Sequence, residues 1–310
     1  MTTEIARIGT RGSALALWQA DHVRELLQDA WPGLTVEIEI ITTHGDKILD
    51  TPLPQIGGKG VFTEELEAAL RAGSIDLAVH SLKDLPTDPS PGLIVGAVPA
   101  REDPRDALVS RGGHTLARLP AGATVGTSSV RRSAQLMRAR PDLRLVDLRG
   151  NVDTRIRKAQ APSGPYDAIV LARAGLVRLG RDEVISEILP IETLLPAPGQ
   201  GALGIQCRDD AESRRLLAPL MHAETAMAVT AERAFLAGLG GGCATPVGAY
   251  AVVEGDRLLL HGRVCAPDGS RQVDVSLQAS ASPKDALTLG EQLARQALAA
   301  GAQALFEAHP

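Results

Sequence analysis

The sequence predicts an α/β protein with two related lobes and a small α+β domain at the C-terminal end. Short apolar strands alternate with amphipathic helices, one strand–loop–helix pattern occurs twice, and the last part of the chain consists of strands joined by hairpin-type turns. Because 44% of the 310 residues are hydrophobic, the chain can bury a core large enough for two or three domains.

The first lobe is predicted from the N-terminal part of the chain. A strand at 5–8 ends in a glycine-containing turn, and Ser13 is suited to cap a helix over 14–30. Apolar residues alternate with acidic ones at 36–40, which indicates a half-exposed strand. The remaining elements are a glycine-rich flap at 57–62, a helix capped by Thr63 and ended by Gly73, and a buried strand at 76–79.

The second lobe repeats this pattern. Residues 125–129 lead into a helix through Arg138, as residues 8–13 lead into the first helix, and the strand at 166–170 resembles 75–79. Proline-rich crossings at 98–104 and 195–199 connect the lobes, so we expect a hinge there. A strand at 202–205 then returns to the first lobe.

The C-terminal part has a different pattern. A helix at 224–239 precedes strands at 247–253, 258–264 and 272–277, and turns at 254–257 and 267–269 join the strands into an antiparallel meander. An Ala/Leu-rich helix from about 284 to 306 closes this α+β domain.

Basic residues are concentrated between 127 and 158, where nine occur with only three acidic residues. Arg138, Arg140, Arg157 and Lys158 are expected on solvated helix faces. The others of interest lie beside strand ends and helix starts, where backbone N–H groups also favour anions, and they predict an anion site: Arg131, Arg132, Arg149 and Arg155.

Two further segments leave alternatives open. Lys83 and Asp84 follow a buried strand and form either an exposed turn or a functional pair, in which Asp84 stabilises a developing cation or moves a proton. Three glycines and Pro246 place Cys243 on a sharp loop. Its thiol is a nucleophile, a metal ligand, a covalent anchor or a small buried side chain. His80 is either part of the functional group around Lys83 and Asp84 or a buried, hydrogen-bonded histidine, whereas Cys207 and Cys265 are expected in the core.

Composition argues against several classes of protein. The formal net charge of −5 argues against a general nucleic-acid binder, and no apolar run reaches the roughly 20 residues of a membrane helix. The N-terminus lacks the pattern of a signal peptide, and three scattered cysteines form no disulfide framework or spaced zinc site. We therefore expect a cytoplasmic protein without a nucleic-acid or membrane partner.

Seven ordered motifs make the chain resemble the porphobilinogen deaminase (hydroxymethylbilane synthase) family over essentially its whole length. They are GTRGSALA at 9–16, GGKGVFT at 57–63, HSLKDLP at 80–86, GTSSVRR at 126–132, LRGNVDTR at 148–155, PGQGA at 198–202, and ER at 232–233 followed by GGCATP at 241–246. The resemblance implies two lobes like type II periplasmic binding proteins, with mixed sheets, and a third domain with a three-stranded antiparallel sheet. The implied boundaries are 1–98 with 199–218, 99–198, and 219–310.

The resemblance also implies the activity. Cys243 would hold a dipyrromethane cofactor through a thioether, and four porphobilinogen molecules would be joined to it head to tail, releasing ammonia at each addition. Hydrolysis would then free the linear tetrapyrrole hydroxymethylbilane. Every addition brings an acetate and a propionate, which suits the predicted anion site. A monomer without a metal is expected.

The resemblance assigns roles to individual residues. Asp84 matches the catalytic carboxylate, which would assist ammonia loss and stabilise the cationic methylene-pyrrole. Cofactor-binding positions besides Cys243 are Lys83, Thr127, Ser129, Arg131, Arg132, Arg149 and Arg155. Substrate-binding positions are Arg11, Ser13, Gln19, Lys59, Phe62, Ser128, Arg178 and Gln200. The flap departs from many relatives at Val61 and Glu64.

A two-lobed cytoplasmic anion-binding or sensor protein is the alternative, because two lobes with an arginine-rich site would serve it equally well. Cys243 and Asp84 discriminate between the two, since a sensor needs neither a tethered thioether nor a catalytic carboxylate. A redox or metal protein would need a second cysteine or a histidine spaced suitably from Cys243, and the sequence has none.

Overall fold

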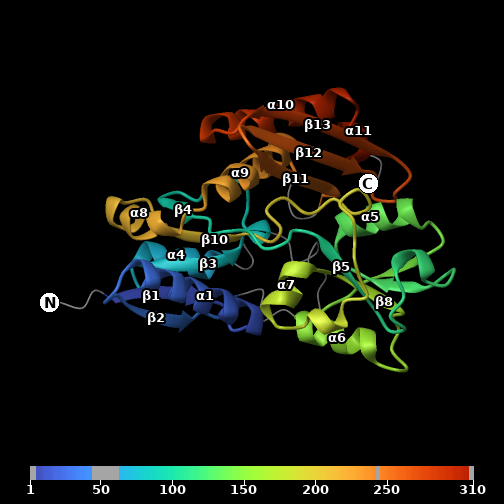
Figure 1. The fold of residues 1–310 in the computed structure, drawn as a ribbon, viewed down its shortest axis with the longest axis horizontal. Coiled ribbons are helices and arrows are strands. Elements are labelled where there is room, and N and C mark those ends of the chain that lie inside the picture. Colours follow the sequence, from blue (N-terminus) through green and yellow to red (C-terminus); the bar gives the residue numbers. More distant parts are fainter. Residues whose placement is uncertain (1–4, 44–62, 242–244, 307–310) are drawn as a thin grey trace. The chain divides into compact units, whose positions relative to one another are not determined.

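The computed structural model describes residues 5–43, 63–241 and 245–306. The chain separates into two compact units, the first formed from 1–101 and 202–226 and the second from 102–201 and 227–310. Three sheets are distributed over these units (Figure 1). The three-domain boundaries remain a prediction. Within the described ranges, no helix has both the length and the hydropathy that crossing a membrane requires.

The first unit contains a five-stranded mixed sheet in the order β2-β1-β3-β10-β4. Its strands are β1 Ile5–Thr10, β2 Thr35–Ile40, β3 Leu77–Ser81, β4 Leu93–Ala97 and β10 Leu203–Arg208. The first three are parallel to one another, whereas β10 runs antiparallel to both β3 and β4. The strand predicted at 202–205 therefore does return to this sheet.

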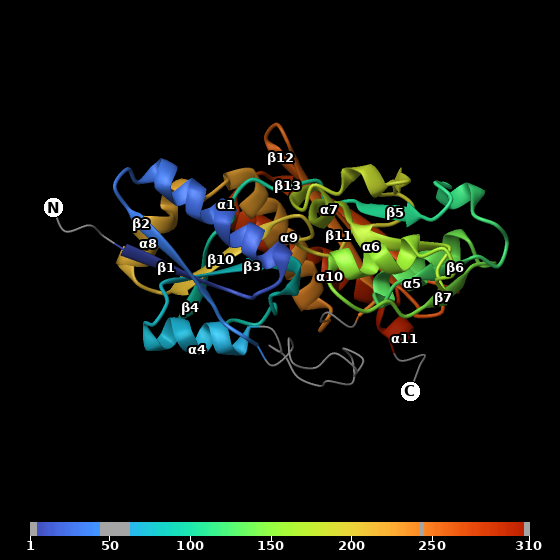
Figure 2. The ribbon, with the colours of Figure 1, turned by 90° about the horizontal axis from the view of Figure 1, so that it is seen from below.

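Helices α1 (Ala14–Ala30) and α4 (Glu64–Ala72) cover opposite faces of this sheet (Figure 2). Ser13 caps α1 as predicted, because its hydroxyl accepts a hydrogen bond from the Ala16 amide at 3.3 Å. Thr63 precedes α4, but its side chain makes no capping hydrogen bond, so that detail of the prediction is wrong. Gly73 ends α4 in the left-handed conformation. A further helix, α8 (Ala211–Leu217), follows β10.

The second unit contains a sheet with the same arrangement of strands, in the order β7-β6-β8-β5-β9. Its strands are β5 Asp106–Ser110, β6 Thr124–Gly126, β7 Arg144–Val146, β8 Ala168–Ala172 and β9 Glu187–Ile188. Again three strands are parallel and the fourth, β5, is antiparallel to both of its neighbours. This confirms the predicted repeat.

Three helices pack on the second sheet. Apolar residues of α5 (Val130–Ala139) pack on one face, and those of α6 (Val152–Gln160) and α7 (Arg173–Arg178) pack on the other. Strand β5 was not predicted, since all five of its residues are buried and it shows no alternation of polar and apolar side chains.

The C-terminal part is the predicted antiparallel meander with its helices. It comprises α9 Ala223–Gly238, β11 Val247–Glu254, β12 Arg257–Cys265, β13 Gln272–Ser280, α10 Pro283–Ala299 and α11 Gln303–Phe306. The turns contain Gly255 and Gly269 at φ of 63° and 71°. The single closing helix predicted to 306 is instead two helices, because Gly301, at φ 94°, interrupts it. The two mixed sheets and this separate antiparallel sheet confirm the predicted fold class.

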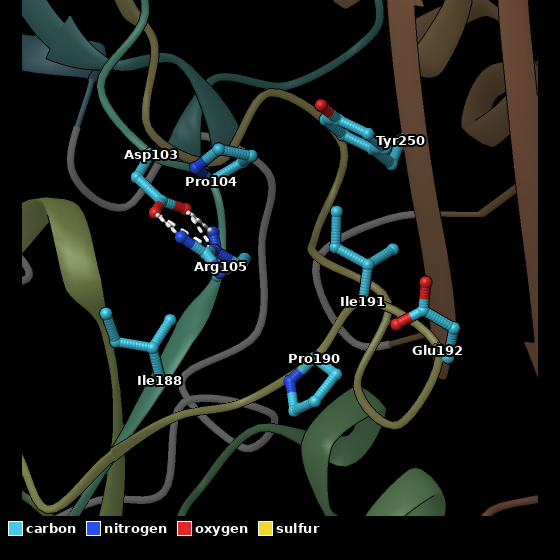
Figure 3. Close-up of a pocket in the computed structure, with 8 residues that line it drawn as sticks. All are labelled: Asp103, Pro104, Arg105, Ile188, Pro190, Ile191, Glu192 and Tyr250. Carbon is cyan, nitrogen blue, oxygen red and sulfur yellow. Dashed lines mark hydrogen bonds and ion pairs between the residues drawn. The ribbon is translucent and has the colours of Figure 1, made fainter.

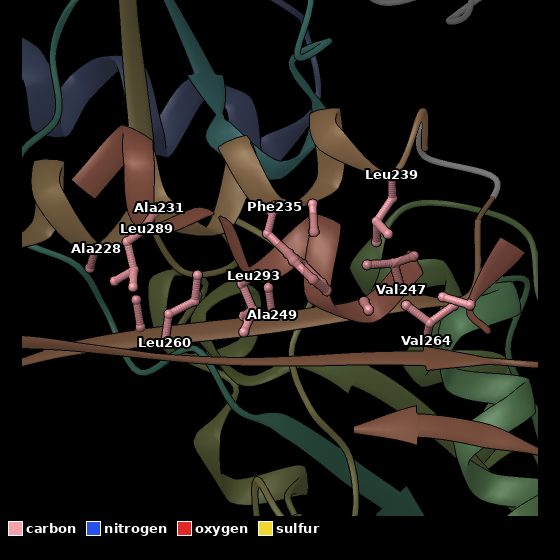
Figure 4. Packing of buried hydrophobic residues seen from close by; sticks show 14 of the residues in the cluster. Ala228, Ala231, Phe235, Leu239, Val247, Ala249, Leu260, Val264, Leu289 and Leu293 are labelled. Atoms are coloured by element: carbon pink, nitrogen blue, oxygen red, sulfur yellow. The ribbon is translucent and has the colours of Figure 1, made fainter. Parts of the chain in front are cut away.

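Two glycines allow the close packing of this C-terminal core (Figure 4). Phe235 of α9 is fully buried, and a Cβ at Gly262 of β12 would lie 2.4 Å from its ring. A Cβ at Gly290 of α10 would lie 2.3 Å from the carbonyl oxygen of Ala231 on α9. The two helices can therefore approach this closely only because residue 290 has no side chain.

Gly290→Ala tests this packing. We expect the free energy of unfolding to fall by about 1–3 kcal/mol, because overpacking against a backbone carbonyl outweighs the higher helix propensity of alanine. Urea denaturation of the variant measures the change, and the exposed Gln292→Ala on the same helix serves as the control. Equal or greater stability of Gly290→Ala would contradict the account of this contact.

Candidate active site

Asp84 and Lys83 are held on an anchored turn at the carboxyl end of β3. Residues Leu82–Asp84 form a single 3-10 turn, and the Leu82 amide donates to the carbonyl of Ala202 at 3.0 Å. Leu82 and Leu85, on either side of the pair, are buried. Asp84 is exposed and Lys83 half-buried, so a fixed backbone presents the carboxylate to solvent.

A buried polar network lies behind this turn. His80 Nε2 donates to Gln206 Oε1 at 3.1 Å, and Gln206 Nε2 donates to Glu67 Oε1 at 3.0 Å. Ser90 and Arg71 also donate to the Glu67 carboxylate. Burial is the main reason that the pKa of His80 falls to about 4, and the positive charge of Arg11 contributes. Of the two alternatives that the sequence left open for His80, the structure shows the buried, hydrogen-bonded histidine.

Three predicted substrate residues lie in the same unit. Arg11 follows β1, Ser13 caps α1, and the buried Gln19 of α1 donates from Nε2 to Ser81 Oγ at 2.8 Å. Gln19 thus ties α1 to the residue just before the Lys83–Asp84 turn. Its observed contact is structural, and substrate binding by Gln19 remains a prediction.

In the second unit, the predicted hydroxyl residues gather at the carboxyl ends of β6 and β7. The Thr127 amide donates to the Val146 carbonyl at 2.9 Å, and Ser129 caps α5. Ser128 Oγ donates to the Leu148 carbonyl at 2.9 Å and accepts from the Leu148 amide at 3.0 Å. These contacts fix the loop that leads to Arg149.

Arg155 and Lys158 of α6 both donate to backbone carbonyls of this loop. Arg155 Nε donates to the carbonyl of Gly150 at 2.7 Å, and Lys158 Nζ donates to the carbonyl of Arg149 at 3.0 Å. Lys158 therefore supports the loop instead of only facing solvent as predicted. The half-buried guanidinium of Arg149 makes no hydrogen bond or ion pair with any described residue.

Arg131 and Arg132 share one buried acid, Asp106. Arg131 NH1 lies 2.9 Å from Asp106 Oδ2, and Arg132 NH2 lies 2.7 Å from Oδ1. Burial alone would raise the pKa of Asp106, but the two guanidinium groups outweigh it and hold the pKa well below its ordinary value. Burial lowers the pKa of Arg131. The cluster keeps one net positive charge, since two arginines face a single carboxylate.

Gln200 and Arg178 bind the crossing segments of the second unit. Gln200 Nε2 donates to the carbonyl of Pro104 at 2.6 Å and to Asp106 Oδ1 at 2.9 Å. Arg178 NH2 donates to the carbonyl of Gly201 at 2.7 Å, and burial lowers its pKa to about 10. Both residues are buried, and these contacts brace the crossings; substrate binding by either remains a prediction.

Two donors suit a ligand that carries several carboxylates. Arg131 is 4% exposed, yet its Nε has no hydrogen-bond partner among the described residues, and Arg149 makes no side-chain hydrogen bond or ion pair within the same ranges. A buried N–H without a partner costs free energy unless a ligand accepts from it. The second unit therefore offers residues that fit a polyanionic group.

Several predicted residues lie outside the described ranges, namely Cys243, Lys59, Phe62 and the flap at 57–62. The other two cysteines of the chain, Cys207 and Cys265, are buried as predicted. Burial raises the pKa of each thiol to about 11, so neither is a reactive thiolate at neutral pH.

A cavity of about 490 Å³ lies elsewhere in the second unit (Figure 3). Asp103, Arg105, Glu192 and Tyr250 are among the residues that line it, and Arg105 binds the Asp103 carboxylate through Nε and NH2. None of the predicted site residues lines this cavity, so its presence does not bear on their roles.

Sequence reasoning missed Asp106, because it lies outside the basic stretch and its neighbours in the sequence give no sign of a buried charge. The nearby Asp103-Pro104-Arg105 resembles an ordinary polar turn. Arg140 was expected on a solvated face, but it pairs with Asp142 at 2.7 Å and donates to the carbonyls of Leu116 and Leu119. That expectation is wrong, because Arg140 is the C-cap residue of α5 and its side chain binds the neighbouring segment.

The fold and these residues define an α/β protein with a buried, positively charged cluster suited to carboxylate ligands. Sequence profiles match two parts of the chain: "Porphobilinogen deaminase, dipyromethane cofactor binding domain" over residues 6–215, and "Porphobilinogen deaminase, C-terminal domain" over 226–299. The chain belongs to the porphobilinogen deaminase family.

Curated relatives named porphobilinogen deaminase agree with this family. The proteins of Roseiflexus castenholzii and Roseiflexus sp. (strain RS-1) are 57% and 58% identical, each over 96% of this chain and 97% of their own length. That of Syntrophotalea carbinolica is 52% identical over 99% of this chain and 97% of its own. Among solved structures, the periplasmic aliphatic sulphonate binding protein SsuA from Escherichia coli is 17% identical, with 76% of this chain and 70% of the SsuA chain covered. Its TM-score of 0.39 is too low to carry an argument.

His80→Gln tests the buried histidine. The unfolded chain takes up a proton near the ordinary histidine pKa of about 6.5, whereas folded His80 does so only near pH 4, so wild-type stability should fall as the pH drops between these values. The neutral, buried His80 is expected to account for a loss of unfolding free energy on the order of 3 kcal/mol over this pH range. Urea denaturation at pH 7 and at pH 4.5 should show a smaller acid loss in His80→Gln than in wild type.

The exposed His261→Gln is the matched control and should keep the wild-type acid loss. An identical loss in wild type and His80→Gln would show that His80 does not titrate as described.

Proposed function

We propose that the chain catalyses the porphobilinogen deaminase (hydroxymethylbilane synthase) reaction and is therefore a transferase of tetrapyrrole and haem biosynthesis. Four porphobilinogen molecules are joined head to tail with release of ammonia, and hydrolysis frees hydroxymethylbilane. The observation that carries this conclusion is the identity of 52–58% to porphobilinogen deaminases over 96–99% of the chain. A two-lobed anion sensor accounts for the arginines but not for this identity.

Asp84 is proposed as the catalytic carboxylate. Its exposure and its anchored backbone support this role, since the carboxylate is accessible while the Leu82 amide and two buried leucines hold the turn in place. A carboxylate fixed before the reaction stabilises positive charge that develops as ammonia leaves, without having to reorganise. Lys83, on the same turn, is proposed to bind a carboxylate.

The arginines are proposed to bind acetate and propionate groups. The unpartnered Arg131 Nε and the guanidinium of Arg149 support this role, together with the net positive charge around Asp106. The proposed cofactor contacts of this unit also include Arg132, Arg155, Thr127 and Ser129. The dipyrromethane, when bound, supplies the chain end to which substrate is added.

Cys243 is proposed as the attachment point of the dipyrromethane. The raised pKa values of Cys207 and Cys265 support this choice, because a buried protonated thiol is a poor nucleophile. We further propose a cytoplasmic monomer that binds neither nucleic acid nor a membrane. The formal net charge of −5 supports the absence of a nucleic-acid partner.

Intact mass spectrometry tests the attachment. Wild-type protein expressed with porphobilinogen available should exceed the mass of its chain by one dipyrromethane. Cys243→Ala should have the bare mass, because the thioether cannot form, and Cys265→Ala, a control at a buried cysteine, should keep the excess. A wild-type mass equal to that of the bare chain would refute the attachment.

Asp84→Asn tests the catalytic carboxylate. The amide keeps the size of the side chain but removes its charge, so kcat should fall roughly 10²-fold or more while the dipyrromethane remains attached. Steady-state kinetics and intact mass on the same preparation measure both. Asp88→Asn, a nearby exposed aspartate, is the control. Near-normal turnover in Asp84→Asn would remove Asp84 from this role.

A further inference from the structure

We infer that Asp106 is a positioning residue of this enzyme: it fixes Arg131 and Arg132 in the arrangement that binds the carboxylates of the dipyrromethane. This inference rests on the proposed function. Asp106 itself is fully buried, so it acts only through the side chains that donate to it, which are Arg131, Arg132 and Gln200.

The carboxylate accepts four donors on its two oxygens. Oδ2 accepts from Arg131 NH1 at 2.9 Å, whereas Oδ1 accepts from Arg132 Nε at 3.1 Å and Arg132 NH2 at 2.7 Å. Gln200 Nε2 also donates to Oδ1, at 2.9 Å. All four groups that face Asp106 are donors, so the residue at this position must accept four hydrogen bonds. Only an ionised carboxylate can accept that many in so small a volume.

The remaining contacts orient each guanidinium. Arg131 NH1 also donates to the Leu195 carbonyl at 2.7 Å, and Arg132 NH1 donates to the Val170 carbonyl at 3.1 Å. With these positions occupied, the buried Nε of Arg131 has no hydrogen-bond partner among the described residues. The same cluster therefore immobilises the arginines and leaves the Arg131 Nε–H group for a ligand.

Asp106 also connects this cluster to both crossing segments. It is the first residue of β5, two positions after the end of the crossing at 98–104. Gln200, immediately after the other crossing at 195–199, accepts from Arg131 NH2 at 3.4 Å and donates to the Pro104 carbonyl. The amide of Glu102 donates to the Gly201 carbonyl at 3.2 Å, so the first crossing is hydrogen-bonded to the residues that directly follow the second. The positions of the arginines are consequently set by both crossings together.

Asp106→Asn is the decisive variant, because an amide of the same size places an NH2 group against donors and leaves two guanidinium charges without an acid. We expect the folded variant to carry at least about tenfold less dipyrromethane, and its loaded fraction to show a KM for porphobilinogen raised about tenfold. Intact mass, reconstitution of the cofactor-free protein with porphobilinogen, and KM against kcat are the readouts. Thermal unfolding identifies folded protein.

Asp142→Asn is the matched control. It removes the charge of another arginine-bound aspartate in the same unit, which pairs with Arg140 at 2.7 Å outside the proposed site, and it should keep wild-type loading and KM. Folded Asp106→Asn with wild-type loading and KM would overturn the inference.

Asp106→Glu tests the positioning role of Asp106 if Asp106→Asn does not fold. It retains the charge but displaces it by one methylene, so loading should largely survive while KM rises severalfold; a wild-type KM in this variant would overturn the inference. Wild-type protein that shows neither the mass excess nor turnover would instead refute the proposed function. The two failures are therefore distinguishable.

Discussion

The ion pairs of Asp106 with Arg131 and Arg132 are the interaction on which the rest of the second unit depends. All three side chains are buried, so water cannot solvate their charges if an ion pair is lost. Breaking a buried ion pair by removing one partner typically costs about 3–5 kcal/mol, a large part of the 5–15 kcal/mol that stabilises an ordinary domain. The cluster joins β5 to the start of α5, to β8 through Val170, and to the segment around Leu195.

The two mixed sheets support their sites in the same way. In each sheet the strand beside the three parallel strands is antiparallel to its parallel neighbour. This strand is β10 in the first sheet, where it comes after the parallel strands in sequence. It is β5 in the second sheet, where it comes before them. In the first sheet the residue just before β10, Ala202, accepts the Leu82 amide and anchors the turn of Asp84. In the second sheet β5 begins with Asp106 itself. In both sheets a residue at the start of the strand that follows a crossing, Ala202 just before β10 or Asp106 at the start of β5, holds residues of the proposed site in place.

Much of the fold could be predicted from local patterns. The bounds of the first helix and its cap by Ser13 followed from helical periodicity, and the meander followed from glycine turns such as those at Gly255 and Gly269. Strand β5 and the break at Gly301 were missed, because full burial removes alternation and because a glycine near the end of an Ala/Leu-rich segment does not reveal its φ angle. In the site, the sequence could single out the arginines that are proposed to bind carboxylates. It could not reveal that Asp106 faces Arg131, since that pairing crosses 25 positions and depends on how β5 packs under α5.

The arginines of the second unit differ in what their surroundings allow. Arg131 and Arg132 are oriented by Asp106 and by backbone carbonyls, so reorienting either one would break buried hydrogen bonds. Arg149 lies on a loop held by Ser128 and Lys158, and its half-buried guanidinium can change rotamer without such a loss. Each addition to the bound chain brings two more carboxylates, whereas the charge around Asp106 is constant. If both kinds of arginine bind the lengthening polyanion as proposed, Arg149 is the one that can adjust its position, because moving Arg131 or Arg132 would break buried hydrogen bonds.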